Sequence, residues 1–150
     1  MKKAEYIYEM TMKVRDYECD LQGIVNNANY QHYMEHTRHE FLESIGLSFA
    51  DLHNKGIDAV VARVNIRYKV PLRSGDLFKS CLWLEKKGIR WIFHQDLYKA
   101  STGELTTAGE VTSVTMVNQV LAQSPELENC LFPYVNKEID ISSNKIVNHG

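Results

Sequence analysis

Residues able to carry out acyl-transfer chemistry gather just ahead of the longest helical pattern in the chain. Asp20 precedes Gly23, and Asn26 and Asn27 stand where the chain turns into that helix. The first-turn N–H groups of a helix lack partners and, with the helix dipole, favour developing negative charge; Gly23 permits a close approach of the backbone. The helix amides could then polarise a carbonyl oxygen while Asp20 either attacks the carbonyl carbon or activates a water. The residues leave both routes open.

Simpler roles exist for the same residues. An aspartate before a helix commonly caps a turn, and asparagines commonly bond to nearby backbone. Cys19 would be a nucleophile in another scheme. Adjacent residues of an extended segment point to opposite faces, however, so we expect Cys19 to lie away from Asp20 as a small buried side chain.

The histidines of the helical pattern raise the possibility of a zinc site. His32 and His36 bracket an H-x-x-E-H sequence, which places both rings on one helix face. They fall opposite the apolar stripe of the helix, so we expect them to be solvated. The sequence therefore predicts no metal and no cofactor.

A helix of about five turns is predicted for residues 28–45. Gly46 is expected to end it, and a short second helix is expected after the capping residue Ser48, ending at Gly56. The apolar stripe of the long helix recurs at spacings of three and four and comprises Tyr30, Tyr33, Met34, Thr37, Phe41 and Ile45.

Five strands are predicted around this helix. Residues 5–15 alternate with period two, and strand patterns follow at 59–70, 77–85, 89–98 and 105–118. Connections of hairpin length make neighbouring strands antiparallel. In the 59–70 strand the expected apolar face comprises Val60, Ala62, Val64, Ile66, Tyr68 and Val70.

One apolar helix stripe and one apolar sheet face suit each other, so we predict an α+β fold in which a five-stranded antiparallel sheet wraps the helix. At 150 residues the chain is expected to be a single domain, 1–150, with its core within about 5–120 and a less patterned tail. The last ten residues are expected to be unstructured. Such a sheet leaves an edge strand unpaired, which favours a homodimer or homotetramer.

Composition excludes several classes of function. The chain has 17 basic and 19 acidic residues, a net charge of −2, and no long Lys/Arg run, so we expect no nucleic-acid partner. No apolar run approaches the roughly 20 residues of a membrane span, and the N-terminal residues lack the apolar region of a secretory signal. With three cysteines and no C-x-x-C pair, a cytoplasmic protein is expected.

Other residues have two readings. Trp83, Trp91 and Phe93 occupy alternate strand positions and would either line an acyl pocket or pack in the core. Arg90, in a predicted hairpin, would contact a phosphate of a ligand or simply be exposed.

The stretch YECDLQGIVNNANYQHYMEHTRHEFLESIG resembles the hot-dog-fold thioesterases of the 4-hydroxybenzoyl-CoA thioesterase family. The family pattern runs D-x-x-G-(I/V)-V, then N-Y or S-Y, an aromatic residue and E-x-(A/T)-R-x-E-x-L. The later stretch RYKVPLRSGDLF is similar to the family's strand followed by Pro and a Gly-Asp turn. The resemblance covers roughly residues 5–120. The matching positions are Asp20, Gly23, Ile24, Val25, Asn29, Tyr30, Tyr33, Glu35, Thr37, Arg38, Glu40 and Leu42.

The resemblance implies a hot-dog fold, hydrolysis of acyl-CoA thioesters without metal, and dimers or tetramers. It makes Asp20 the catalytic carboxylate and the Asn27 amide the carbonyl polariser. We further expect Gly23, Ile24, Val25, Asn26 and Tyr30 to lie around the substrate, and Arg90 to lie near a CoA phosphate.

The paired Asn26-Asn27 also resembles the D-x-N-x-H-V-N-N stretch of plant-type acyl-ACP thioesterases, although Ile24 replaces that motif's histidine. The length and overall pattern favour CoA as the carrier, with acyl carrier protein as the alternative. A hot-dog dehydratase or hydratase, or a noncatalytic acyl-thioester binding protein, is the remaining alternative.

Overall fold

The described residues form two sheets and three α-helices. The structure, a computed structural model, describes residues 2–135, 137–140 and 145–148. The main sheet runs β2-β4-β5-β6-β3 with the short β7 beside β6, and a separate sheet runs β1-β8-β9. In chain order the elements are β1 (Lys2–Ala4), β2 (Tyr8–Lys13), η1 (Asp16–Glu18), α1 (Asn27–Ser44), α2 (Phe49–Asn54), β3 (Ile57–Tyr68), β4 (Leu77–Lys87), β5 (Arg90–Lys99), β6 (Leu105–Val117), β7 (Val120–Leu121), α3 (Pro125–Leu131), η2 (Phe132–Tyr134), β8 (Lys137–Asp140) and β9 (Lys145–Asn148).

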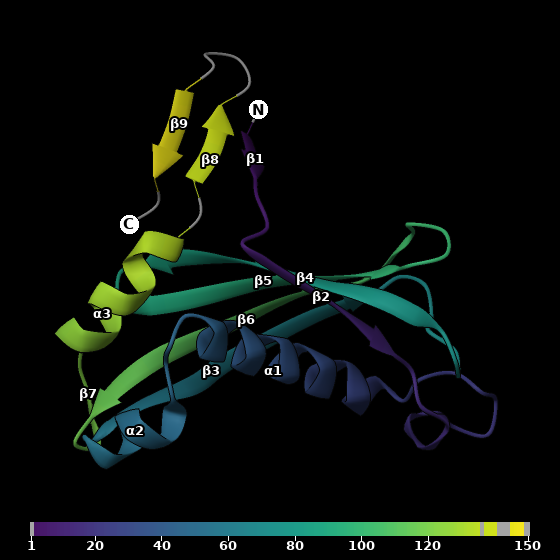
Figure 1. Cartoon of the computed structure of the whole chain (residues 1–150), viewed down its shortest axis with the longest axis horizontal. Coiled ribbons are helices and arrows are strands. Elements are labelled where there is room, and N and C mark those ends of the chain that lie inside the picture. Colours follow the sequence, from purple (N-terminus) through teal and green to yellow (C-terminus); the bar gives the residue numbers. More distant parts are fainter. Residues whose placement is uncertain (1, 136, 141–144, 149–150) are drawn as a thin grey trace.

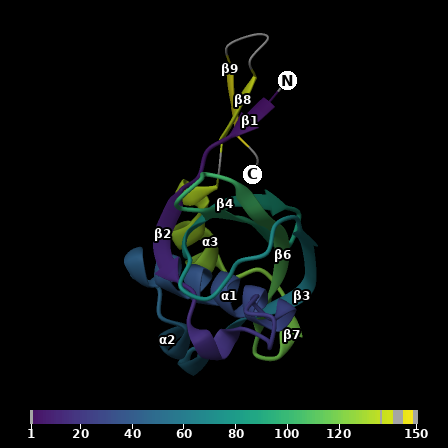
Figure 2. The same ribbon diagram turned by 90° about the vertical axis from the view of Figure 1, so that its right-hand side faces the viewer.

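The main sheet is antiparallel and curls around α1 (Figures 1 and 2). Seen end-on in Figure 2, its strands follow one another around the helix. Alternate residues of β5 are buried, as period-two geometry requires, and Trp91, Phe93, Gln95 and Leu97 are the buried ones. The predicted α+β arrangement of five long antiparallel strands around a central helix is confirmed, with the two-residue β7 as an addition.

The central helix forms where the apolar spacing predicts it, one residue earlier at each end. Gly46 follows it with φ of +85°, a left-handed conformation that favours glycine at a helix end. The short α2 is also confirmed, since the Ser48 side chain accepts a hydrogen bond from the Asp51 amide. The buried residues of α1 are Tyr30, Tyr33, Met34, Thr37, Phe41 and Leu42.

The core divides along α1 into two clusters. One surrounds the C-terminal half of the helix and includes residues of α2 and α3; the other surrounds its N-terminal half. Helix and sheet approach closely at Gly109 of β6, where a Cβ atom would lie 2.7 Å from Met34 Sδ. A buried polar contact also joins them, because the Thr37 and Ser80 hydroxyls lie 2.7 Å apart.

The edge strand β3 differs from its prediction. The register with β6 shifts between Val61 and Arg63, so a β-bulge changes which residues face α1. Strict alternation predicted that Val60 and Val64 share the face toward the helix. In the structure, Val61 and Val64 both line pockets beside the helix. Most of the strand is exposed in the single chain, because β3 ends the sheet and no other strand of the described residues pairs with its outer edge.

The C-terminal part is more ordered than predicted. The helix α3 was missed, although Ser124 before Pro125 is a recognisable helix start: the Ser124 side chain accepts a bond from the Leu127 amide. The expectation of an unstructured end is wrong for β9, which pairs with β8; the rest of the last ten residues lies outside the described residues.

We expect the Thr37→Val variant to lose about 1–3 kcal/mol of unfolding free energy, because the buried Ser80 hydroxyl would be left without its partner. The double variant Thr37→Val/Ser80→Ala removes both polar groups and should be less destabilised than the sum of the single variants. Urea titrations of the four proteins measure this coupling. Strictly additive losses would contradict the assigned contact.

Candidate active site

The loop ahead of α1 is a small hairpin that ends in a turn. Cys19 pairs with Val25 across it. The Asp20 amide donates to the Ile24 carbonyl at 2.9 Å, and the Gly23 amide donates to the Asp20 carbonyl at 3.0 Å. Gly23 has φ of +78°, which explains the requirement for glycine at this turn.

The Asp20 carboxylate is held by the amides of its own loop. Its Oδ1 accepts hydrogen bonds from the Gln22 amide at 2.8 Å and, more weakly, the Ile24 amide at 3.4 Å. Among the described residues, Oδ2 has no protein partner. The side chain is exposed, whereas Cys19 packs partly buried against the core. The expectation that these two neighbours face opposite ways agrees with this arrangement.

The first turn of α1 presents free amides. The Asn26 amide is occupied by the Glu18 carbonyl at 3.0 Å, and the Asn29 amide by the Asn26 carbonyl at 2.9 Å. Within the described part of the chain, the Asn27 and Ala28 amides have no acceptor, and the Asn26 side chain does not cap the helix. These two amides form the helix mouth, which can donate hydrogen bonds to an anionic or partly negative oxygen.

Two residues expected around the substrate are structural. Val25 is buried in the core, and its amide donates to the Leu72 carbonyl at 2.9 Å. The buried Tyr30 hydroxyl accepts a hydrogen bond from the Leu72 amide at 3.0 Å. These contacts fasten the loop before β4 to the start of α1. Ile24 is half-buried, and its backbone forms an isolated antiparallel β-bridge with Arg73.

Arg90 is not brought to this loop. It begins β5 beside the end of β4, whereas the Asp20 loop contacts the segment just before β4, at Arg73 and Ser74. The full length of β4 separates the two positions, on the order of 35 Å at about 3.3 Å per residue. The exposed Arg73 is the cation that the structure places next to the loop instead.

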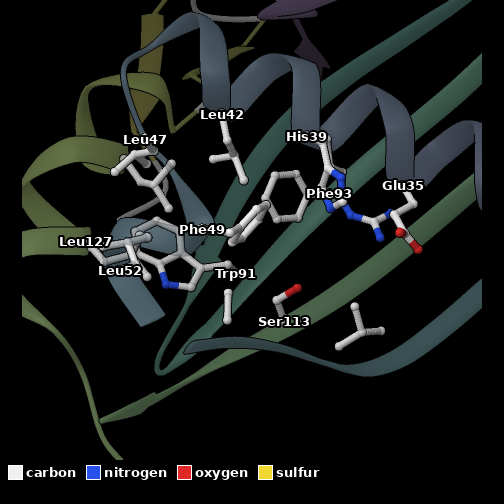
Figure 3. A pocket seen from close by; sticks show the side chains of 14 residues that line it. Glu35, His39, Leu42, Leu47, Phe49, Leu52, Trp91, Phe93, Ser113 and Leu127 are labelled. Atoms are coloured by element: carbon white, nitrogen blue, oxygen red, sulfur yellow. The ribbon is translucent and has the colours of Figure 1, made fainter. Parts of the chain in front are cut away.

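A groove runs along α1 beside β3. Its first part, of about 320 Å³, is lined by Ala28, His32 and Val64 among others. Its second part, of about 350 Å³, is an apolar cavity at the other end of the helix (Figure 3). Both parts are lined by Glu35, Arg38 and Val61, so they adjoin one another. Asp20 lines neither part.

The groove accounts for aromatic residues that the sequence left ambiguous. Trp91 and Phe93 line the apolar cavity and also belong to the core. Trp83 lies on the other face of the sheet, where its ring stacks on His94 with centroids 3.7 Å apart.

Arg38 is the polar residue of the groove whose contacts sequence reasoning did not foresee. Its Nη1 donates to Gln95 Oε1 at 3.0 Å, and Gln95 Nε2 donates to the Met34 carbonyl at 2.9 Å. Burial lowers the pKa of the guanidinium, and the nearby Glu35 charge opposes that shift. The helical spacing of Glu35 and Arg38 was a signal that both share one face.

Tyr33 fixes the turn that precedes the Asp20 loop. Its buried hydroxyl donates to Glu18 Oε1 at 3.0 Å. Burial, followed by this hydrogen bond and the Glu18 charge, raises the pKa of the Tyr33 phenol.

Within the described residues, no group of three His, Cys, Asp or Glu side chains is placed to hold a metal ion. His32 and His36 are exposed. No helix among these residues combines the length and apolar character needed to cross a bilayer.

Comparison with known sequences places this geometry among thioesterases. A profile of the Thioesterase-like superfamily matches residues 14–131. An acyl-acyl carrier protein thioesterase of Arabidopsis thaliana, ATL2, chloroplastic, is 35% identical over 118 residues, which are 75% of this chain and 60% of the relative. The putative acyl-CoA thioesterase YneP of Bacillus subtilis is 31% identical over 102 residues, 67% of this chain and 73% of the relative.

Solved structures share the fold. The hypothetical protein AQ1494 of Aquifex aeolicus superimposes with a TM-score of 0.77 at 28% identity, covering 83% of this chain and 98% of that one. The chain spans less than two thirds of the length of the plant relative.

We expect the unfolding free energy to fall as pH rises above about 10, the usual pKa of a tyrosine phenol. Above this pH the unfolded chain releases the Tyr33 proton, whereas the folded chain, with its raised pKa, keeps it. Because the unfolded state then binds fewer protons, the unfolding free energy decreases as the pH rises. Tyr33→Phe should make this decline shallower in urea titrations at pH 8 and 10.5. Tyr17→Phe, at the 75% exposed tyrosine of the same turn, is the control for tyrosine number. Equal pH slopes in the wild-type and Tyr33→Phe proteins would refute the contribution.

Proposed function

The chain belongs to the Thioesterase-like superfamily, and from that premise we propose that it hydrolyses acyl thioesters. The observation that carries the proposal is the groove formed by two adjoining parts along α1. It begins beside the free first-turn amides of Asn27 and Ala28 and ends in an apolar cavity. An acyl group lying in this groove would have its carbonyl at the electropositive helix mouth and its tail in the cavity.

Asp20 supplies the reactive carboxylate in this proposal. Because Oδ1 is held by loop amides, Oδ2 is the oxygen free to act. As a base, it takes a proton from water while the water oxygen attacks the thioester carbon. As a nucleophile, it forms an acyl-enzyme anhydride that water then hydrolyses. In either route the C–S bond breaks, the thiolate leaves and takes up a proton, and the Asn27 amide stabilises the carbonyl oxygen.

The carrier attached to the acyl group is either CoA or acyl carrier protein. YneP is named a putative acyl-CoA thioesterase, and the Arabidopsis relative is named an acyl-acyl carrier protein thioesterase. The exposed Arg73 beside the Asp20 loop is suited to a phosphate of the carrier, which both carriers possess.

Asp20→Asn should lower the rate of thiol release from acyl-CoA by about 100-fold or more, the scale of an acid–base contribution, with the unfolding midpoint little changed. Thiol release followed with a chromogenic disulfide, across short, long and aromatic acyl-CoAs, measures this. The control is Asp51→Asn, an exposed first-turn carboxylate of α2. Full activity in Asp20→Asn would defeat the assignment of Asp20.

A second reaction class has one observation in its favour. His32 lines the groove together with Ala28, so an imidazole is present near the helix mouth for the acid–base chemistry of a hydratase. The same panel separates the functions: water addition to an enoyl-CoA without thiol release indicates a hydratase, and acyl-CoA binding without either reaction indicates a binding protein.

The open edge strand supports a homodimer as the working form. The 12-residue β3 ends the main sheet and exposes Val60, Val61, Val64 and Tyr68. A long apolar edge of this kind is a template for pairing with another chain. The Tyr68 hydroxyl donates to the Asn27 carbonyl at 3.5 Å, so a partner paired along β3 would lie next to the helix mouth and cover the groove. Two such dimers would make a tetramer.

We expect light scattering to give the mass of a dimer or tetramer at micromolar concentration. Val64→Lys should dissociate it and reduce thiol release, because a charge would be buried at the proposed interface. Val120→Lys, at a 63% exposed valine of β7, is the matched control and should leave the mass unchanged. A stable, active wild-type monomer would refute the proposal.

A further inference from the structure

The apolar cavity has one polar end and one apolar end. Glu35 and His39 of α1 lie at one side of it in Figure 3, and Leu127, Leu52 and Trp91 lie at the other. Apart from Ser113, the polar lining residues all belong to α1. A ligand that passes the polar side therefore meets an almost wholly hydrocarbon interior.

The far wall of the cavity is the short helix α3. Leu127 and Leu131 are one helical turn apart, both line the cavity, and both are buried. Ser124 caps this helix and Pro125 begins it. The position of α3 beyond the C-terminal half of α1 is visible in Figure 1.

Two ion pairs fasten this wall to other elements. Glu126 Oε1 lies 2.6 Å from Lys55 Nζ, just after α2. Glu128 pairs with Lys86 of β4, whose side chain is only 4% exposed. The Lys86 ammonium also lies 3.9 Å from the ring centroid of Trp91, which forms part of the cavity lining. The wall is therefore tied to the sheet at the depth where a ligand would end.

We propose that α3 sets the maximum length of the acyl group, and that the group is an aliphatic chain whose methyl end abuts Leu127 and Leu131. This inference rests on the proposed function for the direction of binding. The groove part of about 320 Å³ and the cavity of about 350 Å³ together hold the chain between the helix mouth and this wall. A hydroxyl or carboxylate at the far end would lose its hydration without gaining a partner, so the chain is unsubstituted there.

Fluorescence provides a direct binding test. Trp83→Phe removes the tryptophan on the other face of the sheet, which leaves Trp91 in the cavity wall as reporter. Saturated fatty acids of 6 to 22 carbons are titrated against this variant, with benzoate as the aromatic comparison. Affinity should rise with length to an optimum within this series and then fall at least tenfold. Affinity that levels off or keeps rising up to 22 carbons, or tighter binding of benzoate, would overturn the proposal.

Opposite changes to the wall should shift this optimum in opposite directions. In the same background, Leu131→Ala should move it to longer chains by about two carbons, and Leu131→Phe should move it to shorter ones. The kcat/KM profile over the matching acyl-CoA series should shift in parallel. Unshifted optima in both variants would refute the role of α3. Chain-length-dependent binding without thiol release would instead refute the thioesterase function and leave the wall intact.

The two ion pairs supply a matched comparison. Glu128→Gln breaks the buried pair with Lys86 and should flatten the length preference, so that chains longer than the wild-type optimum bind within about threefold of it. Glu126→Gln breaks the more exposed pair with Lys55 and should retain most of the preference. An unaltered length profile in Glu128→Gln would show that this anchor does not hold the wall.

Discussion

The central helix can bury only part of its surface against the sheet of its own chain, and much of the molecule follows from that constraint. One stripe of α1 packs onto the concave sheet, where Met34 meets Gly109 and Thr37 meets Ser80. The sheet ends at β3, so the helix side next to this strand remains open. The same open side provides the groove and explains why β3 exposes apolar residues that would be costly to leave unpaired.

Hydrogen bonding at the start of α1 separates structural donors from available ones. The Asn26 and Asn29 amides are used within the loop, and the Asn27 and Ala28 amides are not. The Asp20 carboxylate is itself held by loop amides, which limits its rotation before any substrate arrives. In the proposed site, this arrangement would require less reorganisation when charge develops on a substrate than bulk water requires.

The cavity at the other end of α1 depends on parts of the chain far apart in sequence. The helices α2 and α3 and the strands β3, β5 and β6 all contribute side chains. The buried pair of Lys86 and Glu128 is costly to desolvate and gives little stability by itself. Its role is geometric: it holds one side of the cavity at a fixed place beside Trp91.

Local patterns in the sequence determined the central helix, the five long strands and the residues at the helix mouth. The spacing of Tyr30, Met34 and Phe41 specified one buried stripe, and Gly46 specified its end, because helix periodicity and left-handed glycine depend only on neighbouring residues. The family resemblance drew attention to Asp20 and Asn27. Local residue spacing did not reveal the β-bulge between Val61 and Arg63, which arises from pairing of β3 with β6.

Tertiary structure alone decided which of these residues meet. It buried Val25 and Tyr30, moved Arg90 to the far end of β4, and set Arg73 beside the Asp20 loop. It also placed α3 over the end of the groove, although Ser124 and Pro125 already marked a helix start in the sequence. These placements depend on strand register and on packing between distant elements, which residue spacing along one strand or helix does not encode.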